Sequence, residues 1–344
     1  MLALLILIFA VLSLISYIED DLDPKVVSLL FLAMIFIMAL VVGLRPEGID
    51  HDYGHYIEMY NKSYELTTEF TFLLIANFVS IVFDDYVFLF LIYALLSLAL
   101  KYWVIKKLSK LHFLSLLMAL CTFYILHDFN QIRAGVASGF MLLSIPYLFE
   151  EQRWKYILFI VLATCFHYSA IIMLAFVFLS GKPFSKLDYC LYGAIIPFSY
   201  ACYFLQISPF FLIPIPYFEE KLEAYQAIQE TKDAYDVNVF NLVILVKIAI
   251  SYFLLIMSKV IEEKNKYFPL LLKFEIISLA SFILFTEVPI LSFRVNELIG
   301  VVEYILFPLI FYTIKPEWVS RGVVIIMAFV LLIINIFFNQ FLYL

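Results

Sequence analysis

The chain has 344 residues, of which 65% are hydrophobic and only 15% are charged. Soluble globular chains are about 45–50% apolar and about 25% charged, so this composition excludes an ordinary water-soluble domain and predicts a membrane protein. The net charge of −7 is spread over short loops, and the chain has no basic, aromatic-rich patch of the kind that binds nucleic acid.

The apolar runs predict many membrane crossings. A crossing helix needs about 20 apolar residues, so we expect an all-α, polytopic integral membrane fold of about 10–12 transmembrane helices, in one domain over residues 1–344. The first run is interpreted as a retained span, since it has neither the basic region nor the cleavage site of a signal peptide. Spans are predicted at residues 1–18, 26–44, 86–105, 111–126, 134–149, 187–205, 238–258, 268–286, 298–314 and 319–341.

The basic residues predict the orientation of these spans. Lys and Arg gather in short loops, which stay on the cytoplasmic side of a membrane. Both termini and the remaining loops are then expected on the outer face. These outer loops are residues 45–85, 127–133, 206–237 and 287–297.

The first outer loop carries tyrosines and carboxylates close together. Tyr53, Tyr56 and Tyr60 are spaced so that a helix would place them on one face, and Asp50 and Asp52 precede them. Carboxylates accept hydrogen bonds from hydroxyl groups, and flat rings cover the apolar faces of a pyranose, so this loop is a candidate sugar site. The alternative is a belt of tyrosines at the membrane interface.

Two histidines in the same loop raise the question of a metal. His51 and His55 are spaced i, i+4, as in helical metal-binding pairs. No clear third ligand accompanies them, so we expect no metal and no cofactor. The D-x-D spacing of Asp50 and Asp52 leaves a metal as the alternative.

The second outer loop ends in Arg133, which opens a predicted helix. A cation there opposes the helix dipole, whereas an anion would be favoured by both the arginine and the free backbone N–H groups. We interpret Arg133 as an anion ligand, with a salt-bridged or snorkelling arginine as the alternative. Gly135 and Gly139 have the GxxxG spacing that lets another helix pack closely.

Residues 156–180 do not fit a simple crossing, because basic loops flank them on both sides. About 25 residues are too few for two full crossings, so a broken, re-entrant pair of short helices is predicted, with its tip near His167. A single tilted span is the alternative. An ionisable residue inside such a segment is a functional candidate, and the ordinary pKa of histidine suits acid–base chemistry near neutral pH.

Two further outer segments have functional features. Residues 206–236 contain several prolines and then become amphipathic, which predicts a helix lying along the membrane interface. In the last outer loop, Arg294 and Glu297 are spaced i, i+3 and can pair with each other. The planar donor fork of Arg294 would equally suit a diphosphate.

Several motifs, taken in order, resemble the EpsG-type family of Wzy-like polysaccharide polymerases. They are GLR-x(4)-D-x-DYxxY at 43–56, NQIRAGVASG at 130–139, RWKY at 153–156, FHYSA at 166–170 and R-x-x-E at 294–297. The resemblance covers nearly the whole chain and is most specific between Asn130 and Ala170. Ala134 stands where the family usually has a glutamine after the arginine, which affects that glutamine's role and not that of Arg133.

The resemblance implies a GT-C-like glycosyltransferase in the bacterial cytoplasmic membrane. Its substrate would be an oligosaccharide on undecaprenyl diphosphate, its surroundings membrane lipid, and a further partner a chain-length regulator. The growing glycan would pass to a new lipid-linked unit at the outer face. A glycan ligase with the same donor and a transporter or flippase are the alternatives.

The residues are assigned to this chemistry as follows. Arginines would hold the diphosphate and stabilise its developing charge, and a histidine or carboxylate would accept the proton of the attacking hydroxyl. The candidate proton acceptors are His167, Asp50 and Asp52. The candidate diphosphate ligands are Arg133, Arg294 and Arg45. The candidate sugar-binding residues are Tyr53, Tyr56, Tyr60, Asn130, Gln131 and Glu297.

Overall fold

The computed structural model describes residues 1–62, 68–207 and 237–343, and these residues fall into two compact units. Unit 1 comprises Met1–Gly181, Glu263–Tyr267 and Glu303–Leu344, and unit 2 comprises Lys182–Glu262 and Phe268–Val302. The sequence showed no boundary between them. Most of the predicted amphipathic segment at 206–236 lies outside the described residues.

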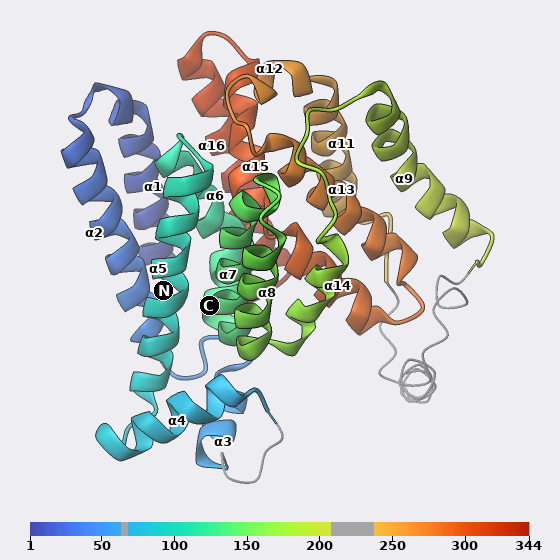
Figure 1. The fold of residues 1–344 in the computed structure, drawn as a ribbon. Coiled ribbons are helices and arrows are strands. Elements are labelled where there is room, and N and C mark those ends of the chain that lie inside the picture. The colour runs from blue at the N-terminus through green and yellow to red at the C-terminus, as the bar shows by residue number, and fades with distance from the viewer. Residues whose placement is uncertain (63–67, 208–236, 344) are drawn as a thin grey trace. The chain divides into compact units, whose positions relative to one another are not determined.

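Unit 1 is a bundle of helices (Figure 1). Its first part contains α1 (Leu2–Ile18), the short η1 (Glu19–Asp21), α2 (Pro24–Gly43), α3 (Tyr53–Asn61), α4 (Phe70–Val82) and α5 (Val87–Leu108). The middle part contains α6 (His112–Ala119), η2 (Leu120–Asn130), α7 (Ile132–Phe149), α8 (Arg153–Phe166) and η3 (Tyr168–Phe176). The last part contains α15 (Glu303–Leu306), η5 (Phe307–Thr313), α16 (Glu317–Ile333) and η6 (Ile334–Phe338).

Unit 2 is formed by five helices in the described part of the chain. They are α9 (Lys186–Phe204), α11 (Leu242–Ile256), α12 (Ser258–Glu262), α13 (Phe268–Leu284) and α14 (Pro289–Gly300). Residues from Pro289 onward were expected in an outer loop. They are helical instead, because Pro289 is favourable in the first turn of a helix and the apolar run that follows continues it.

The fold is that of a polytopic all-α membrane protein. Within the described residues, seven helices are long and apolar enough to cross a membrane. The shorter apolar helices α4 and α11 and helices α9 and α13 account for the other predicted apolar segments. The β-type pairing found in the described part of the chain is an isolated antiparallel bridge between Asp50 and Leu342.

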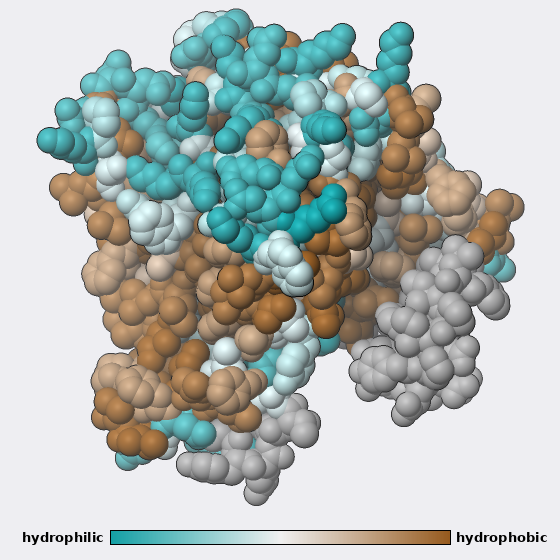
Figure 2. Space-filling view, viewed as in Figure 1, coloured by the Kyte–Doolittle hydropathy of each residue, from teal (hydrophilic) through white to brown (hydrophobic). Residues whose placement is uncertain are grey.

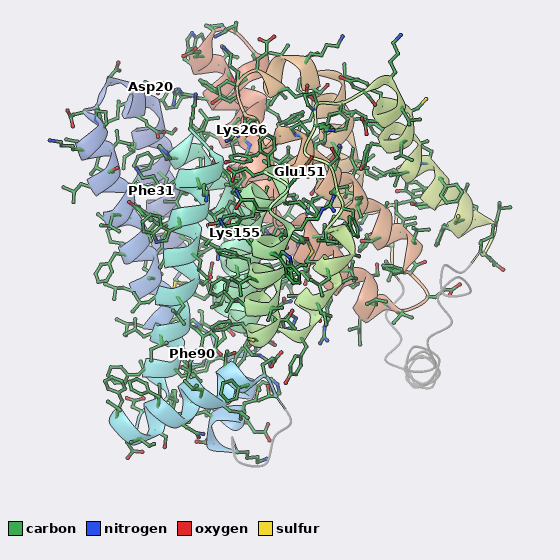
Figure 3. The ribbon with its side chains drawn as sticks, in the orientation of Figure 1. Asp20, Phe31, Phe90, Glu151, Lys155 and Lys266 are labelled. Carbon is green, nitrogen blue, oxygen red and sulfur yellow. The ribbon has the colours of Figure 1, made fainter. Side chains whose placement is uncertain are left out.

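The two ends of unit 1 differ in character. Asp20, Glu151 and Lys266 lie toward one end, and Phe90 lies toward the other (Figure 3). Hydrophilic residues gather at the first end above a broad hydrophobic surface (Figure 2). At the opposite end, α3 and α4 lie across the ends of the bundle helices (Figure 1). The predicted orientation of unit 1 in a membrane stays a prediction.

The centre of unit 1 is formed by α6, η2 and α7, whose residues are almost all buried. The predicted GxxxG packing is confirmed, since a Cβ atom at Gly139 would lie 2.6 Å from Cβ of Leu100 on α5. The predicted outer loop at 127–133 is wrong in its first half. His127 to Asn130 continue a π-helix and are buried. Asp128 accepts a hydrogen bond from Lys101 there, and Asn130 donates to the carbonyls of Ile125 and Phe341.

The break predicted within residues 156–180 is confirmed. Helix α8 ends at Phe166, and the backbone of His167 is extended, with φ −152° and ψ 112°. The chain then packs back along α8, where the hydroxyl of Tyr156 donates a hydrogen bond of 2.5 Å to the carbonyl of Met173. His167 is therefore the tip of a folded-back pair rather than a position in one continuous span.

Candidate active site

Three polar side chains from distant parts of the sequence meet at the end of unit 1 that carries α3 and α4. Nη1 of Arg133, in the first turn of α7, donates hydrogen bonds to Oε2 of Glu69 and, at 2.9 Å, to Oγ1 of Thr68. Nδ1 of His167 lies 3.4 Å from Oε1 of Glu69. We call Glu69, Arg133 and His167 the Glu69 cluster.

The three members differ in their access to water. The side chain of Glu69 is 5% exposed, whereas those of Arg133 and His167 are 19% and 21% exposed. Nε of Arg133 is buried and has no hydrogen-bond partner among the described residues. The carboxylate is thus shielded, while the two basic side chains reach the surface and Arg133 retains an unused donor.

The charge of Glu69 is fixed by its neighbours. Burial raises the pKa of its carboxyl group, but the contact with His167 and the positive charge of Arg133 outweigh burial and lower the pKa from 4.5 to about 2. Glu69 is therefore ionised at any physiological pH, and its one negative charge faces two basic side chains.

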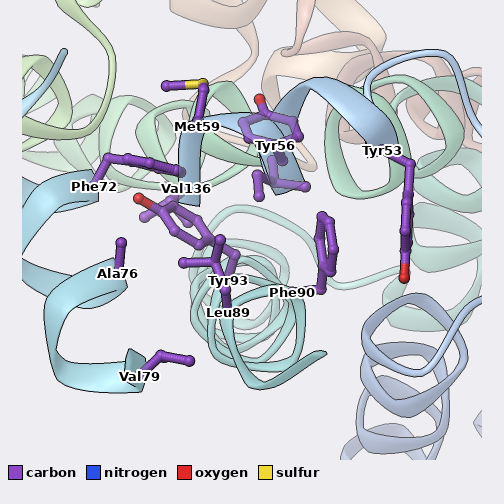
Figure 4. Packing of buried hydrophobic residues seen from close by; sticks show 11 residues of the cluster. Tyr53, Tyr56, Met59, Phe72, Ala76, Val79, Leu89, Phe90, Tyr93 and Val136 are labelled. Carbon is purple, nitrogen blue, oxygen red and sulfur yellow. The ribbon is translucent and has the colours of Figure 1, made fainter. Parts of the chain in front are cut away.

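An aromatic core holds these elements together (Figure 4). It includes Tyr56 from α3, Phe72 from α4 and Tyr93 from α5, all at most 3% exposed. The guanidinium carbon of Arg133 lies 5.7 Å from the ring centroid of Tyr56 and 5.8 Å from that of Phe72. These rings pack against the guanidinium group and stabilise it by cation–π attraction.

The three predicted sugar-binding tyrosines do lie on one helix, α3. Tyr53 and Tyr56 are each 3% exposed, and the ring of Tyr53 stacks on Phe90 with 4.5 Å between centroids. Their ring faces are therefore covered by protein, so we assign them to packing rather than to sugar binding. Tyr60 is half-buried and stays a predicted sugar contact.

Arg45 and Asp50 bind each other rather than leaving a group for substrate. Nε of Arg45 donates a hydrogen bond of 2.6 Å to Oδ2 of Asp50, and both side chains are 0% exposed. The remaining guanidinium nitrogens donate to the carbonyls of Val42, at 2.9 Å, and Phe129, at 2.8 Å. The predicted roles of Arg45 in diphosphate binding and of Asp50 as a base therefore do not agree with their burial and full pairing.

Asp52 remains available in the same loop. It precedes α3 and is half-buried. Burial raises its pKa, the charge of Asp50 raises it further, and His55, His51 and Arg133 lower it, with a net increase. Asp52 therefore lies within the electrostatic reach of Arg133 and stays a candidate proton acceptor.

The histidine pair of this loop has other contacts. The two ring nitrogens of His51 each lie 2.6 Å from an oxygen, the carbonyl of Gln340 and the hydroxyl of Tyr343. Within the described residues, no group of three or more His, Cys, Asp or Glu side chains is arranged to hold a metal ion. The expected independence of metal stays a prediction.

Asn130 and Gln131 lie where η2 meets α7. Nδ2 of Asn130 donates to the carbonyls of Ile125 at 2.9 Å and Phe341 at 3.0 Å, and its Oδ1 accepts from the backbone N–H of His51 at 3.1 Å. The amide of Asn130 is thus used to join the first loop, η2 and the C-terminal residues. Gln131 is half-buried, and its sugar-binding role stays a prediction.

Arg294 and Glu297 belong to unit 2, on α14. Arg294 is exposed, and Glu297 is half-buried. The predicted pairing between them is not among the ion pairs of the described residues. Their roles toward diphosphate and sugar stay predictions.

Comparison with known proteins gives the family. The sequence profile of the EpsG family matches residues 28–343, which is most of the chain. The chain belongs to the EpsG family. The resemblance stated from the sequence motifs is therefore confirmed.

A relative of this EpsG-family chain is the amylovoran biosynthesis protein AmsC of Erwinia amylovora, which is 25% identical over 201 residues. The match covers 54% of this chain and 54% of AmsC, so the chain spans about half the length of the curated relative it matches. No solved structure matches the chain. The expected GT-C-like arrangement accordingly stays a prediction.

Two functional candidates in this EpsG-family protein escaped the sequence analysis. Glu69 lies directly before the apolar helix α4 and was not singled out from the sequence. Asp128, taken as a loop residue, accepts hydrogen bonds from Nζ of Lys101 at 2.7 Å and from Ser97 at 2.5 Å, deep inside unit 1. The sequence signal for the Lys101–Asp128 pair was Lys101, a lone lysine inside an otherwise apolar span. Such a residue is a functional candidate by default.

Proposed function

We propose that this EpsG-family protein is a glycosyltransferase that polymerises oligosaccharide repeat units carried on a lipid diphosphate. The growing glycan would leave its diphosphate and join a new lipid-linked unit at the outer face of the bacterial cytoplasmic membrane. The observation that carries the proposal is the Glu69 cluster, which brings an arginine with an unused donor and a histidine to one partly exposed site. The relation to AmsC, which is named for amylovoran biosynthesis, supports a biosynthetic role.

Arg133 is proposed to bind the diphosphate. It lies in the first turn of α7, where the helix dipole also favours an anion. Its planar donor fork suits two phosphate oxygens at once. As the glycosidic bond breaks, negative charge builds on the leaving diphosphate, and a fixed cation at that position lowers the barrier. Arg294 of unit 2 is also proposed to bind a diphosphate, and turnover of Arg294→Lys tests that assignment separately.

His167 is proposed to accept the proton. The acceptor hydroxyl oxygen attacks C1 of the donor sugar, the bond from C1 to the diphosphate oxygen breaks, and the diphosphate leaves with the bonding electron pair. The hydroxyl proton passes to Nε2 of His167, because Nδ1 faces Glu69. No further reactant is needed for this balance. Asp52 is the alternative acceptor, since it is half-buried and lies within the electrostatic reach of Arg133.

The size of glycans in a deletion strain tests the proposed function against a ligase. A polymerase deletion should accumulate lipid carrying a single repeat unit, and the ladder of longer products should return when the gene is restored. Full-length polymer that stays unattached would instead identify a ligase. Repeat units trapped on the inner side of the membrane would identify a flippase.

A further inference from the structure

Glu69 stands between the two groups assigned above, and each of its carboxylate oxygens faces a different one. Oε2 accepts hydrogen bonds from Nη1 of Arg133 and from Oγ1 of Thr68, the latter at 2.9 Å. Oε1 lies 3.4 Å from Nδ1 of His167 and accepts the backbone N–H of Tyr168 at 3.3 Å. One buried negative charge is thus shared by the proposed diphosphate ligand and the proposed base.

We propose that Glu69 couples the two, so that a lipid diphosphate binding to Arg133 releases Glu69 to act on His167. This inference rests on the proposed function for the roles of Arg133 and His167. It makes Glu69 a positioning residue, since it acts on the substrate through its two basic neighbours.

The first step is a competition for Arg133. In the free protein the carboxylate of Glu69 occupies Nη1. A diphosphate carries more negative charge than one carboxylate and offers several oxygens to the donor fork, so it can displace Glu69 from the arginine. Glu69 therefore lowers the affinity of the site for the diphosphate, because that contact has to be given up on binding.

The second step is the effect on His167. Once Arg133 turns to the diphosphate, the charge of Glu69 is no longer neutralised from the Oε2 side and acts on the imidazole. A negative charge within about 4–6 Å favours the protonated form of histidine, which makes it a stronger proton acceptor. Since the side chain of Glu69 is only 5% exposed, little water is available to screen this effect.

The elements around His167 carry other titratable groups, and all of them are part of its environment. Tyr168 follows it in η3, and the groups on the remaining elements act on it or on its partners. These groups are Glu69 before α4, Arg133 on α7, His127 on η2, Asp52 before α3, Tyr56 on α3 and Tyr93 on α5. Among them, Glu69 is the carboxylate within ion-pair distance of the imidazole.

The coupling makes an unusual prediction for Glu69→Gln. The amide keeps the shape of the side chain but removes the charge that competes for Arg133 and assists His167. Binding of the diphosphate should therefore become stronger while turnover becomes slower. If Glu69 had a merely structural role, its substitution would weaken diphosphate binding and slow turnover together.

The test is calorimetric binding of farnesyl diphosphate to the full chain in lipid nanodiscs, combined with turnover on lipid-linked repeat units. For Glu69→Gln we expect affinity to rise on the order of tenfold and kcat to fall by a similar factor. His167→Gln should lower kcat without raising the affinity, because it removes the proposed base and leaves the competition of Glu69 for Arg133 intact. Glu69→Asp should partly restore turnover.

Glu19→Gln is the matched control, since Glu19 is a similarly buried carboxylate paired with His112 at 3.0 Å, at the other end of the bundle. It should change neither affinity nor kcat. If the wild type binds farnesyl diphosphate and Glu69→Gln binds it equally or more weakly, the coupling is wrong while the proposed function stands. If the wild type does not bind this diphosphate, the role of Arg133 in the proposed function fails first.

Discussion

Nζ of Lys101 donates a hydrogen bond of 2.7 Å to Oδ1 of Asp128, with both side chains at most 1% exposed. The pair joins α5 to the π-helix η2, and the adjacent Gly135 leaves the space for it, since a Cβ there would lie 2.9 Å from the carbonyl oxygen of His127. The π-helix η2 runs directly into α7, which carries Arg133, so the pair fixes the element that precedes this arginine.

The Lys101–Asp128 pair predicts a double-mutant result. Lys101→Met alone should leave a buried carboxylate without its cation and lower the free energy of unfolding by about 3–5 kcal/mol. The double variant Lys101→Met with Asp128→Asn should recover most of this loss, because no isolated charge remains. Thermal unfolding of purified protein in detergent measures both. Equal destabilisation by the single and double variants would show that the charge pairing is unimportant.

The proton acceptor can be identified from the turnover of single variants. His167→Ala should slow turnover by about 10² or more, because it removes the proposed base. His112→Gln, which alters the other histidine–carboxylate pair, should keep wild-type turnover. If Asp52→Asn abolishes turnover while His167→Ala is nearly normal, Asp52 is the base.

The lowered pKa of Glu69 predicts that the free energy of unfolding decreases at acid pH. Its pKa falls from 4.5 to about 2 on folding. A lowered folded-state pKa contributes stability that is fully present above pH 4.5 and is lost as the pH falls toward 2. The difference in melting temperature between the wild type and Glu69→Gln should therefore be constant above about pH 5 and shrink below 4.5. A difference that stays the same down to pH 3 would contradict the assigned ionisation.

The elements that could be predicted from the sequence are those with local signals. Basic residues on both sides of 156–180 predicted the break at His167, and the glycine spacing predicted the close contact of Gly139 with α5. The helical face of Tyr53, Tyr56 and Tyr60 was also predicted. In each case the pattern lies within a few helical turns, so no long-range contact had to be known.

The candidate site was only half predicted, because its partners are far apart in the sequence. Arg133 and His167 were recognised as ionisable residues beside apolar segments. Glu69 is separated from them by 64 and 98 positions, which no local periodicity can reveal. Arg45 and Asp50 looked like free charges in a polar loop, although the folded chain buries them against each other. Hydropathy alone cannot distinguish a solvated charge from a paired one.

Metal independence is predicted from the chemistry, since arginine can stabilise a leaving diphosphate without a cation. A purified assay with lipid-linked repeat units should show full turnover in excess EDTA. Activity that is lost in EDTA and restored by Mg²⁺ or Mn²⁺ would contradict this prediction.

The role of Arg133 is the central claim, and the same purified assay tests it most directly. Arg133→Lys keeps the charge but loses the two-oxygen donor fork, so turnover of lipid-linked repeat units should fall by roughly tenfold or more. Arg153→Lys, at an exposed arginine at the start of α8, is the matched control and should retain wild-type turnover. Wild-type turnover and an unchanged ladder of polymer lengths for Arg133→Lys would contradict the proposal that this arginine binds the leaving diphosphate.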